Sequence, residues 1–310
     1  MTIDPDVRAL LDQLGPPSPV PAEDLTADEL RQGARQAIAA FTRGADPIPV
    51  DDVVDVLVQG RAGNIPVRIY SPGTPTAVLV FLHGGGWTTG GIETSDLVTR
   101  RLCRDTGAVV VSVDYRMLPE NPFPAPFDDS YDAAVWAGAL HPELPFLVAG
   151  DSAGGTLAAC IALKARDDRG PRIDAQVLIY PGIDDDVDRP DVRALADTSR
   201  ITLEDLRFLL RQYGSQGSEY ALPGRAKDLT GLPPAVMVVA GNDLLRPSNE
   251  DYARRLLEAG VAVTIQFDPE LVHGWIDFAP RVPSADRAFT RLTTTVSSLI
   301  RRGAGLRMEG

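Results

Sequence analysis

Short runs of consecutive apolar residues recur along the chain and alternate with stretches in which the apolar residues have helical spacing. Runs without polar residues at alternate positions are typical of parallel strands that are buried on both faces of a sheet. Two earlier segments are instead predicted to pair antiparallel, because Gly63-Asn64 separates them as a turn. We therefore expect an α/β fold with a central, mostly parallel sheet, antiparallel N-terminal strands and flanking helices. The expected strands are residues 53–58, 65–70, 77–82, 108–113, 146–149, 177–180, 235–240 and 261–267.

The first fifty residues, 1–50, precede this pattern and are predicted to form a helical cap segment. A short helix is expected at 7–14, and a proline-rich connector follows it at 16–21. Thr26 and Glu29 have the spacing of a capping box, so a second helix should begin at Thr26. The apolar face of that helix suits a helix that closes the core and a lid over a pocket equally well, and both interpretations stay open.

The remaining chain, residues 51–310, is predicted to be one domain built on the sheet. Residues 182–227 contain no apolar run that suits a buried strand. This stretch is therefore interpreted as a cap insertion above the sheet. A chain of 310 residues is within the range of single α/β domains, and its 44% hydrophobic residues supply enough apolar surface for one core.

Charge and targeting signals limit the expected partners and compartment. The chain carries 30 basic and 43 acidic residues, a net charge of −13, which repels nucleic acids and anionic membrane surfaces. Its start has no basic stretch followed by an apolar core, and no apolar run is long enough to span a bilayer. We therefore expect a cytoplasmic protein. Cys103 and Cys160 lie in expected helices among apolar residues and are predicted to be buried thiols rather than a disulfide.

The most distinctive turn lies between the expected strand at 146–149 and the helical pattern that follows it. Ser152 lies on this turn, with Gly150 and Gly154 two residues away on either side. A strand that reverses sharply into a helix leaves little room for Cβ atoms, and glycine meets that requirement. The turn would hold the Ser152 hydroxyl above the sheet, beside the free amide of Ala153 at the positive end of the helix. A serine placed in this way is a candidate nucleophile.

Two further groups follow other expected strands, at the sheet edge where the carboxyl ends of parallel strands meet. A run of three glycines begins at Gly84 and can direct several bare amides at one oxygen. Gly84, Gly85 and Ala153 are therefore the candidate oxyanion donors. Asp243 follows the strand at 235–240 and is a candidate acid.

The chain has three histidines, so the general base can be chosen by elimination. His83 heads the glycine run and is expected to be structural, whereas His141 lies in a polar linker and is expected to be exposed. His273 remains, just after the last expected strand, although a lone histidine before Gly-Trp is more often a packing residue than a base. Ser152, Asp243 and His273 have the order nucleophile, acid, base, each after a strand, and this combination favours a catalytic triad.

Several motifs resemble the hormone-sensitive-lipase-like branch of the α/β-hydrolases from about Ile65 onward. The two specific motifs are His83-Gly84-Gly85-Gly86-Trp87 and Gly150-Asp151-Ser152-Ala153-Gly154-Gly155. The likeness extends to Asp114-Tyr115-Arg116, Pro122-Phe123-Pro124-Ala125, Tyr180-Pro181, Gly231-Leu232-Pro233-Pro234-Ala235 and Tyr252-Ala253. The resemblance implies a capped α/β-hydrolase fold whose triad is Ser152, Asp243 and His273, and substrates that are esters of short to medium acyl chains. It implies no metal and no cofactor.

The chain departs from the family's pattern near the acid. Leu244 stands where the family usually has proline, and Pro247 where an acidic residue is common. Neither change removes a catalytic group, but both can shift the loop that carries Asp243. Asp268 and Asp277 are therefore reserve candidates for the acid.

Together these groups predict a serine carboxylesterase that forms an acyl-enzyme on a small-molecule ester, as a monomer or homodimer. The same triad also suits an amidase, formamidase or acyltransferase of secondary metabolism, because esters and amides pass through the same tetrahedral species. The alternative of another class is a ligand receptor that kept the fold but lost catalysis. Such a receptor is expected to lack a triad member, whereas this chain lacks none. Asp151 is expected to brace the site by hydrogen bonding rather than to react.

Overall fold

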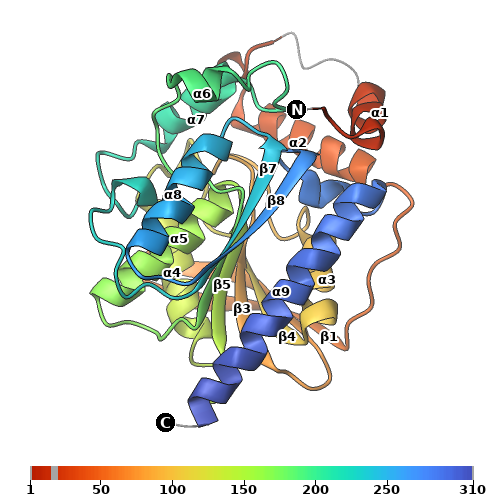
Figure 1. Cartoon of the computed structure of the whole chain (residues 1–310). Coiled ribbons are helices and arrows are strands. Elements are labelled where there is room, and N and C mark those ends of the chain that lie inside the picture. Colours follow the sequence, from red (N-terminus) through yellow and green to blue (C-terminus); the bar gives the residue numbers. More distant parts are fainter. Residues whose placement is uncertain (1, 15–19, 309–310) are drawn as a thin grey trace.

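The structure, a computed structural model, describes residues 2–14 and 20–308. Its strands are β1 (Asp52–Gly60), β2 (Gly63–Ser71), β3 (Ala77–Leu82), β4 (Ala108–Val113), β5 (Phe146–Asp151), β6 (Ala175–Ile179), β7 (Ala235–Asn242) and β8 (Val263–Val272). They form one sheet in the order β1-β2-β4-β3-β5-β6-β7-β8, which runs through the centre of the molecule (Figure 1). β2 pairs antiparallel with β1 and β4, and the later pairings are parallel. The predicted fold class is therefore confirmed.

The interior strands follow the apolar runs because helices cover both of their faces. β3 and β4 span the expected residues, and every residue in them is buried. β8 differs, because it lies at the edge of the sheet and begins at Val263 rather than at residue 261. Ile265 is 50% exposed and Phe267 is 41% exposed on this strand. An apolar run does not encode the position of a strand in the sheet, so it predicted the strand but not its exposure.

Helices pack on both faces of the sheet, and each face has its own apolar core. The helices are α1 (Pro5–Leu14), α2 (Ala27–Phe41), α3 (Asp96–Thr106), α4 (Ala125–Ala137), α5 (Ala153–Asp167), α6 (Pro190–Arg193), α7 (Leu203–Tyr213), α8 (Arg246–Glu258) and α9 (Pro283–Met308). Short 3₁₀ turns are η1 (Ala22–Asp24), η2 (Pro223–Arg225) and η3 (Trp275–Phe278). One core includes residues of α4, α5 and α8, and the other includes residues of α3 and α9, which lie across the sheet from them in Figure 1.

The helices show the state of both cysteines and whether any described helix could cross a bilayer. Cys103 of α3 and Cys160 of α5 are buried free thiols, as predicted. Within residues 2–14 and 20–308, no helix combines the length and the apolar character that crossing a bilayer requires.

The helices α2, α6 and α7 lie beyond the carboxyl ends of the parallel strands (Figure 1). α2 begins as predicted, since the Thr26 hydroxyl accepts from the Glu29 amide and the Glu29 carboxylate accepts from the Thr26 amide. Thr202 and Asp205 form a second capping box at the start of α7, which the sequence analysis did not identify. The connector predicted at 16–21 lies largely outside the described residues.

Polar contacts tie α2 to the loops at this end of the sheet. The Arg31 guanidinium donates to the carbonyl oxygens of Thr88 and Leu118 and pairs with Glu120 at 2.7 Å. Thr88 lies just after the glycine run, so α2 is attached directly to the loop that carries it.

Candidate active site

The turn between β5 and α5 holds Ser152 in a strained backbone conformation. Ser152 has φ 53° and ψ −121°, outside the regions that residues with side chains normally adopt. A Cβ at Gly150 would overlap the backbone of Gly154, and a Cβ at Gly154 would overlap the carbonyl group of Leu82. The two glycines thus permit the sharp turn that raises Ser152 above the sheet.

Gly154→Ala is expected to lower the free energy of unfolding by about 3 kcal/mol or more, because the new methyl group overlaps a carbonyl that β3 holds in place. Gly33→Ala in α2 is the matched control, since a Cβ there meets no atom within 4 Å. Alanine inside a helix should raise the free energy of unfolding by about 0.5–1 kcal/mol. Urea unfolding measures both values, and equal stability of the two variants would contradict the tight turn.

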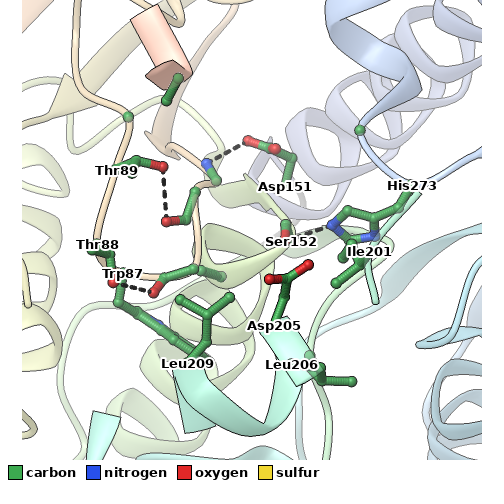
Figure 2. Close-up of a pocket in the computed structure, with 18 of the residues that line it drawn as sticks. Trp87, Thr88, Thr89, Asp151, Ser152, Ile201, Asp205, Leu206, Leu209 and His273 are labelled. Carbon is green, nitrogen blue, oxygen red and sulfur yellow. Dashed lines mark hydrogen bonds between the residues drawn. The ribbon is translucent and has the colours of Figure 1, made fainter. Parts of the chain in front are cut away.

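Ser152, His273 and Asp243 lie in one hydrogen-bonded chain. His273 Nε2 lies 2.8 Å from Ser152 Oγ, drawn as a dashed line in Figure 2, and His273 Nδ1 lies 2.8 Å from Asp243 Oδ2. Asp243 is fully buried, and the Leu245 amide donates to its other oxygen at 3.0 Å. Because a carboxylate only accepts, the Nδ1 atom carries the proton and Nε2 is left to accept from the serine hydroxyl.

The two reserve acids do not contact the imidazole. Asp268 is 2% exposed and forms an ion pair with Arg291 instead. Asp277 lines the same cavity as Ser152, but its side chain forms no hydrogen bond with a described residue. Among the three candidate acids, Asp243 is the one in contact with His273.

The other two histidines match their expected surroundings. His83 is 1% exposed and stacks on Tyr115, with ring centroids 4.2 Å apart. Burial lowers the pKa of His83 to about 4, so the ring is neutral at physiological pH. The His141 side chain is 38% exposed and lies 3.4 Å from Glu143.

The glycine run differs from the prediction at one position. The Gly84 amide donates to Asp151 Oδ1 at 2.8 Å, drawn as the dashed line from Asp151 in Figure 2. The prediction that Gly84 is an oxyanion donor is therefore wrong, because its N–H already has a partner. Asp151 makes the bracing hydrogen bond that was expected of it.

Three other amides around Ser152 are available. The N–H groups of Gly85, Gly86 and Ala153 make no hydrogen bond with any residue that the structure describes, and all three residues line the cavity. Gly86 has φ 60°, and a Cβ there would lie 2.5 Å from the Leu209 side chain of α7. Gly86 was not among the donors predicted from the sequence, although its place in the glycine run was a signal.

Two carboxyl groups near the nucleophile interact electrostatically. Burial raises the pKa of Asp151, and the charge of Asp277 raises it further, while the hydrogen bond from Gly84 opposes the rise. Burial also raises the pKa of Asp277, against the opposing effects of Arg200 and His273. A proton on one of the two carboxyls relieves both their repulsion and their desolvation.

The site opens into a cavity of about 470 Å³ between the sheet and the helices α2 and α7. Its apolar lining comes from α2, from α7 and from the segment just before α7, and includes Leu30, Ala34, Ile38, Ile201, Leu206 and Leu209. Figure 2 shows Leu206 and Leu209 on helix α7, beside the loop of Trp87. Trp87 stacks on Tyr213 with ring centroids 3.9 Å apart, so the end of α7 is packed against the glycine loop.

Known proteins are similar to this chain in sequence and in fold. A family model described as alpha/beta hydrolase fold matches residues 79–277. The chain is 37% identical to Esterase LipI of Mycobacterium tuberculosis over 283 residues, which cover 86% of this chain and 88% of the relative. It is 41% identical to Carboxylesterase NlhH of the same species over 244 residues, 74% of this chain and 76% of the relative.

A solved structure agrees with these sequence matches. An esterase of Pyrobaculum calidifontis superposes with a TM-score of 0.88 at 33% identity, covering 96% of this chain and 99% of the esterase. The family match spans most of the sheet, both specific motifs and His273. The chain therefore belongs to the hormone-sensitive-lipase-like branch of the α/β-hydrolase fold family.

Proposed function

We propose that the protein hydrolyses carboxylic esters of short to medium acyl chains through an acyl-enzyme on Ser152. The observation that carries this proposal is the hydrogen-bonded chain from Ser152 through His273 to buried Asp243, which faces a cavity lined by free amides. The relatives named esterase and carboxylesterase support the ester as the bond that is cleaved.

The first half of the reaction forms the acyl-enzyme. His273 takes the Ser152 proton at Nε2 while the Ser152 oxygen attacks the ester carbonyl. Asp243 keeps the imidazole in the required tautomer and stabilises its positive charge. The amides of Gly85, Gly86 and Ala153 are placed to donate to the oxyanion, and each such donor typically lowers the barrier by about 3 kcal/mol.

The second half releases the acid. The imidazolium of His273 gives its proton to the leaving alkoxide, so the tetrahedral intermediate collapses to the acyl-enzyme and a free alcohol. Water then enters, His273 takes one of its protons, and the resulting hydroxide equivalent attacks the acyl carbonyl. Collapse of the second intermediate returns the proton to Ser152 and releases the carboxylic acid.

The lining of the cavity supports the proposal that the acyl chains are short to medium in length. Residues of 1–50 and of 182–227 form its apolar walls, and we propose that these segments act as the cap of a catalytic domain at 51–310. We also propose a cytoplasmic monomer or homodimer that uses no cofactor and acts on a small-molecule ester. The net charge of −13 supports the absence of nucleic-acid and anionic-membrane partners.

A series of p-nitrophenyl esters tests the proposal. We expect kcat/KM to be highest for butyrate or octanoate and at least about tenfold lower for palmitate, because α2 and α7 limit the cavity and leave part of a long chain in water. Butyryl anilide and a butyryl thioester, added in competition, test the alternative amidase and acyltransferase functions. Faster cleavage of the anilide than of the ester would contradict esterase as the main activity, and no turnover of any ester would contradict the proposal itself.

A further inference from the structure

Arg200 is a charged residue of the cavity that the proposed mechanism does not use. Arg200 precedes α7 and lines the cavity, where it remains accessible. The protein that surrounds its guanidinium removes water from the charge and so lowers the pKa of Arg200. The guanidinium forms no hydrogen bond and no ion pair with any residue in the described part of the chain. Arg207 of the same region behaves differently, since it pairs with Asp188 at 2.6 Å.

Two aromatic rings hold the Arg200 side chain in place. Its Cζ atom lies 5.2 Å from the centre of the Phe41 ring and 5.6 Å from that of Phe278. A cation is attracted to ring faces at these distances. The two rings are fully buried and pack edge to face, with centroids 4.7 Å apart. The guanidinium is therefore supported by rigid groups and does not depend on a carboxylate for its position.

The guanidinium lies next to the backbone that carries the catalytic base. A Cβ at Gly274 would lie 2.6 Å from Arg200 Nη1, so the bare backbone after His273 makes room for the cation. Gly274 has φ 75°, a conformation that also favours glycine. Arg200 thus lies on the His273 side of the cavity.

Asp277 supplies an acceptor in the same place. Its carboxyl group feels the charge of Arg200 and lines the cavity, but its side chain makes no hydrogen bond within residues 2–14 and 20–308. Two other carboxylates of the cavity are engaged, because Asp205 belongs to the capping box of α7 and Asp184 accepts from the Asp186 amide. A donor and an acceptor that have no hydrogen-bond partner among the described residues therefore line the same side of the cavity, near His273.

We propose that Arg200 and Asp277 form a subsite for a hydroxyl group on the alcohol part of the ester, an inference that rests on the ester hydrolysis proposed above. His273 gives its proton to the leaving oxygen, so the alcohol part lies on the His273 side of the cavity. A hydroxyl both accepts from a guanidinium and donates to a carboxylate, and it satisfies both groups. A carboxylate or phosphate is disfavoured there because the Asp277 carboxylate repels a second anion.

The subsite predicts a substrate class, monoesters of diols or polyols. When an ester without the hydroxyl binds, the polar groups of Arg200 and Asp277 lose their hydrogen bonds with water and gain none in return. The subsite is therefore expected to lower kcat/KM for that ester relative to the hydroxylated one. The apolar residues on α2 and α7 then remain for the acyl chain.

Hydroxyethyl butyrate and propyl butyrate form a matched pair for the test, since they differ by a hydroxyl in place of a methyl group. We measure the ratio of their kcat/KM values, which cancels differences in folding or in the triad between variants. Arg200→Met should lower the ratio by about tenfold relative to the unmodified protein, Asp277→Ala should lower it as well, and Arg200→Lys should retain most of it. Arg207→Met removes a cap arginine outside the cavity and should leave the ratio unchanged.

The possible results separate this inference from the function on which it rests. A ratio that falls in Arg200→Met and Asp277→Ala, but not in Arg207→Met, supports the subsite. Turnover of both esters with the same ratio in all variants would overturn the subsite and leave ester hydrolysis standing. No turnover of either ester by the unmodified protein would overturn both. If Arg200→Met does not fold, the ratio in Asp277→Ala decides in the same way.

Discussion

Ser152→Ala is expected to lower kcat for a short aryl ester by at least about 10⁴-fold, the largest effect that we predict. The variant retains the cavity and the amides of Gly85, Gly86 and Ala153, but no atom remains to form the acyl-enzyme. Alanine replaces serine at the same φ of 53°, so the backbone strain of the turn is unchanged. Steady-state hydrolysis of p-nitrophenyl butyrate measures the effect.

The control for this variant is a second serine of the same cavity. Ser95 lines the cavity, but its hydroxyl forms no hydrogen bond with His273. Ser95→Ala should keep kcat within about threefold of the unmodified protein, because its change is a single oxygen away from the reacting groups. A fluorophosphonate should also label the unmodified protein at Ser152 and fail to label Ser152→Ala. Turnover within tenfold of the unmodified protein in Ser152→Ala would show that another group is the nucleophile.

Asp243→Asn is expected to lower kcat by about 10⁴-fold while the protein stays folded. The asparagine amide can donate to His273 Nδ1, which places the imidazole proton on Nε2, where it blocks acceptance of the serine proton. The 2.8 Å contact between Asp243 and His273 is the geometry on which this expectation depends. The pH dependence of kcat, measured with the same ester, should flatten as well, because the imidazole no longer acts as the base.

Asp268→Asn is the matched control, since it changes a buried carboxylate on the adjacent strand. Asp268 pairs with Arg291 and accepts from Gln266, so its loss should lower stability but change kcat by less than about tenfold. Thermal unfolding and kcat are measured on both variants. If Asp268→Asn abolished turnover and Asp243→Asn did not, the acid would have to be reassigned.

The packing of α7 on the glycine loop affects how changes in kcat and KM should be interpreted. Leu209 of α7 lies where a Cβ of Gly86 would be, and Tyr213 stacks on Trp87. Changes in α7 therefore alter both the cavity wall and the loop that carries two of the proposed oxyanion donors. A variant of α7 with a lower kcat at unchanged KM would indicate that the glycine loop has moved, whereas a higher KM alone would indicate a change in the cavity wall.

Local pattern was sufficient to predict the fold and to select the three residues that the structure brings into one hydrogen-bonded chain. The apolar runs of β3 and β4 coincide with the strands because burial on both faces leaves no polar position. The capping box at Thr26 and the glycines around Ser152 are equally local, because each depends on residues only a few positions apart. His273 was selected because the chain has only three histidines and because this one follows a strand. Composition and topology together were therefore sufficient to identify the histidine that contacts Ser152 and Asp243.

Tertiary packing decided the features that depend on residues far apart in the chain. The glycine run was evident, but the structure shows that Asp151 of another strand accepts from the Gly84 amide, whereas no described residue accepts from the Gly86 amide. The exposure of Phe267 depends on the edge position of β8, which no local pattern encodes.

Arg200 and Asp277 have ordinary neighbours in sequence and line one cavity only because the segment before α7 folds over the end of the sheet. The sequence by itself therefore determined which elements form and which groups can react, since both follow from nearby residues. The structure alone decided which amides and which charged side chains have hydrogen-bond partners among the described residues, because hydrogen-bond pairing and burial depend on the whole fold.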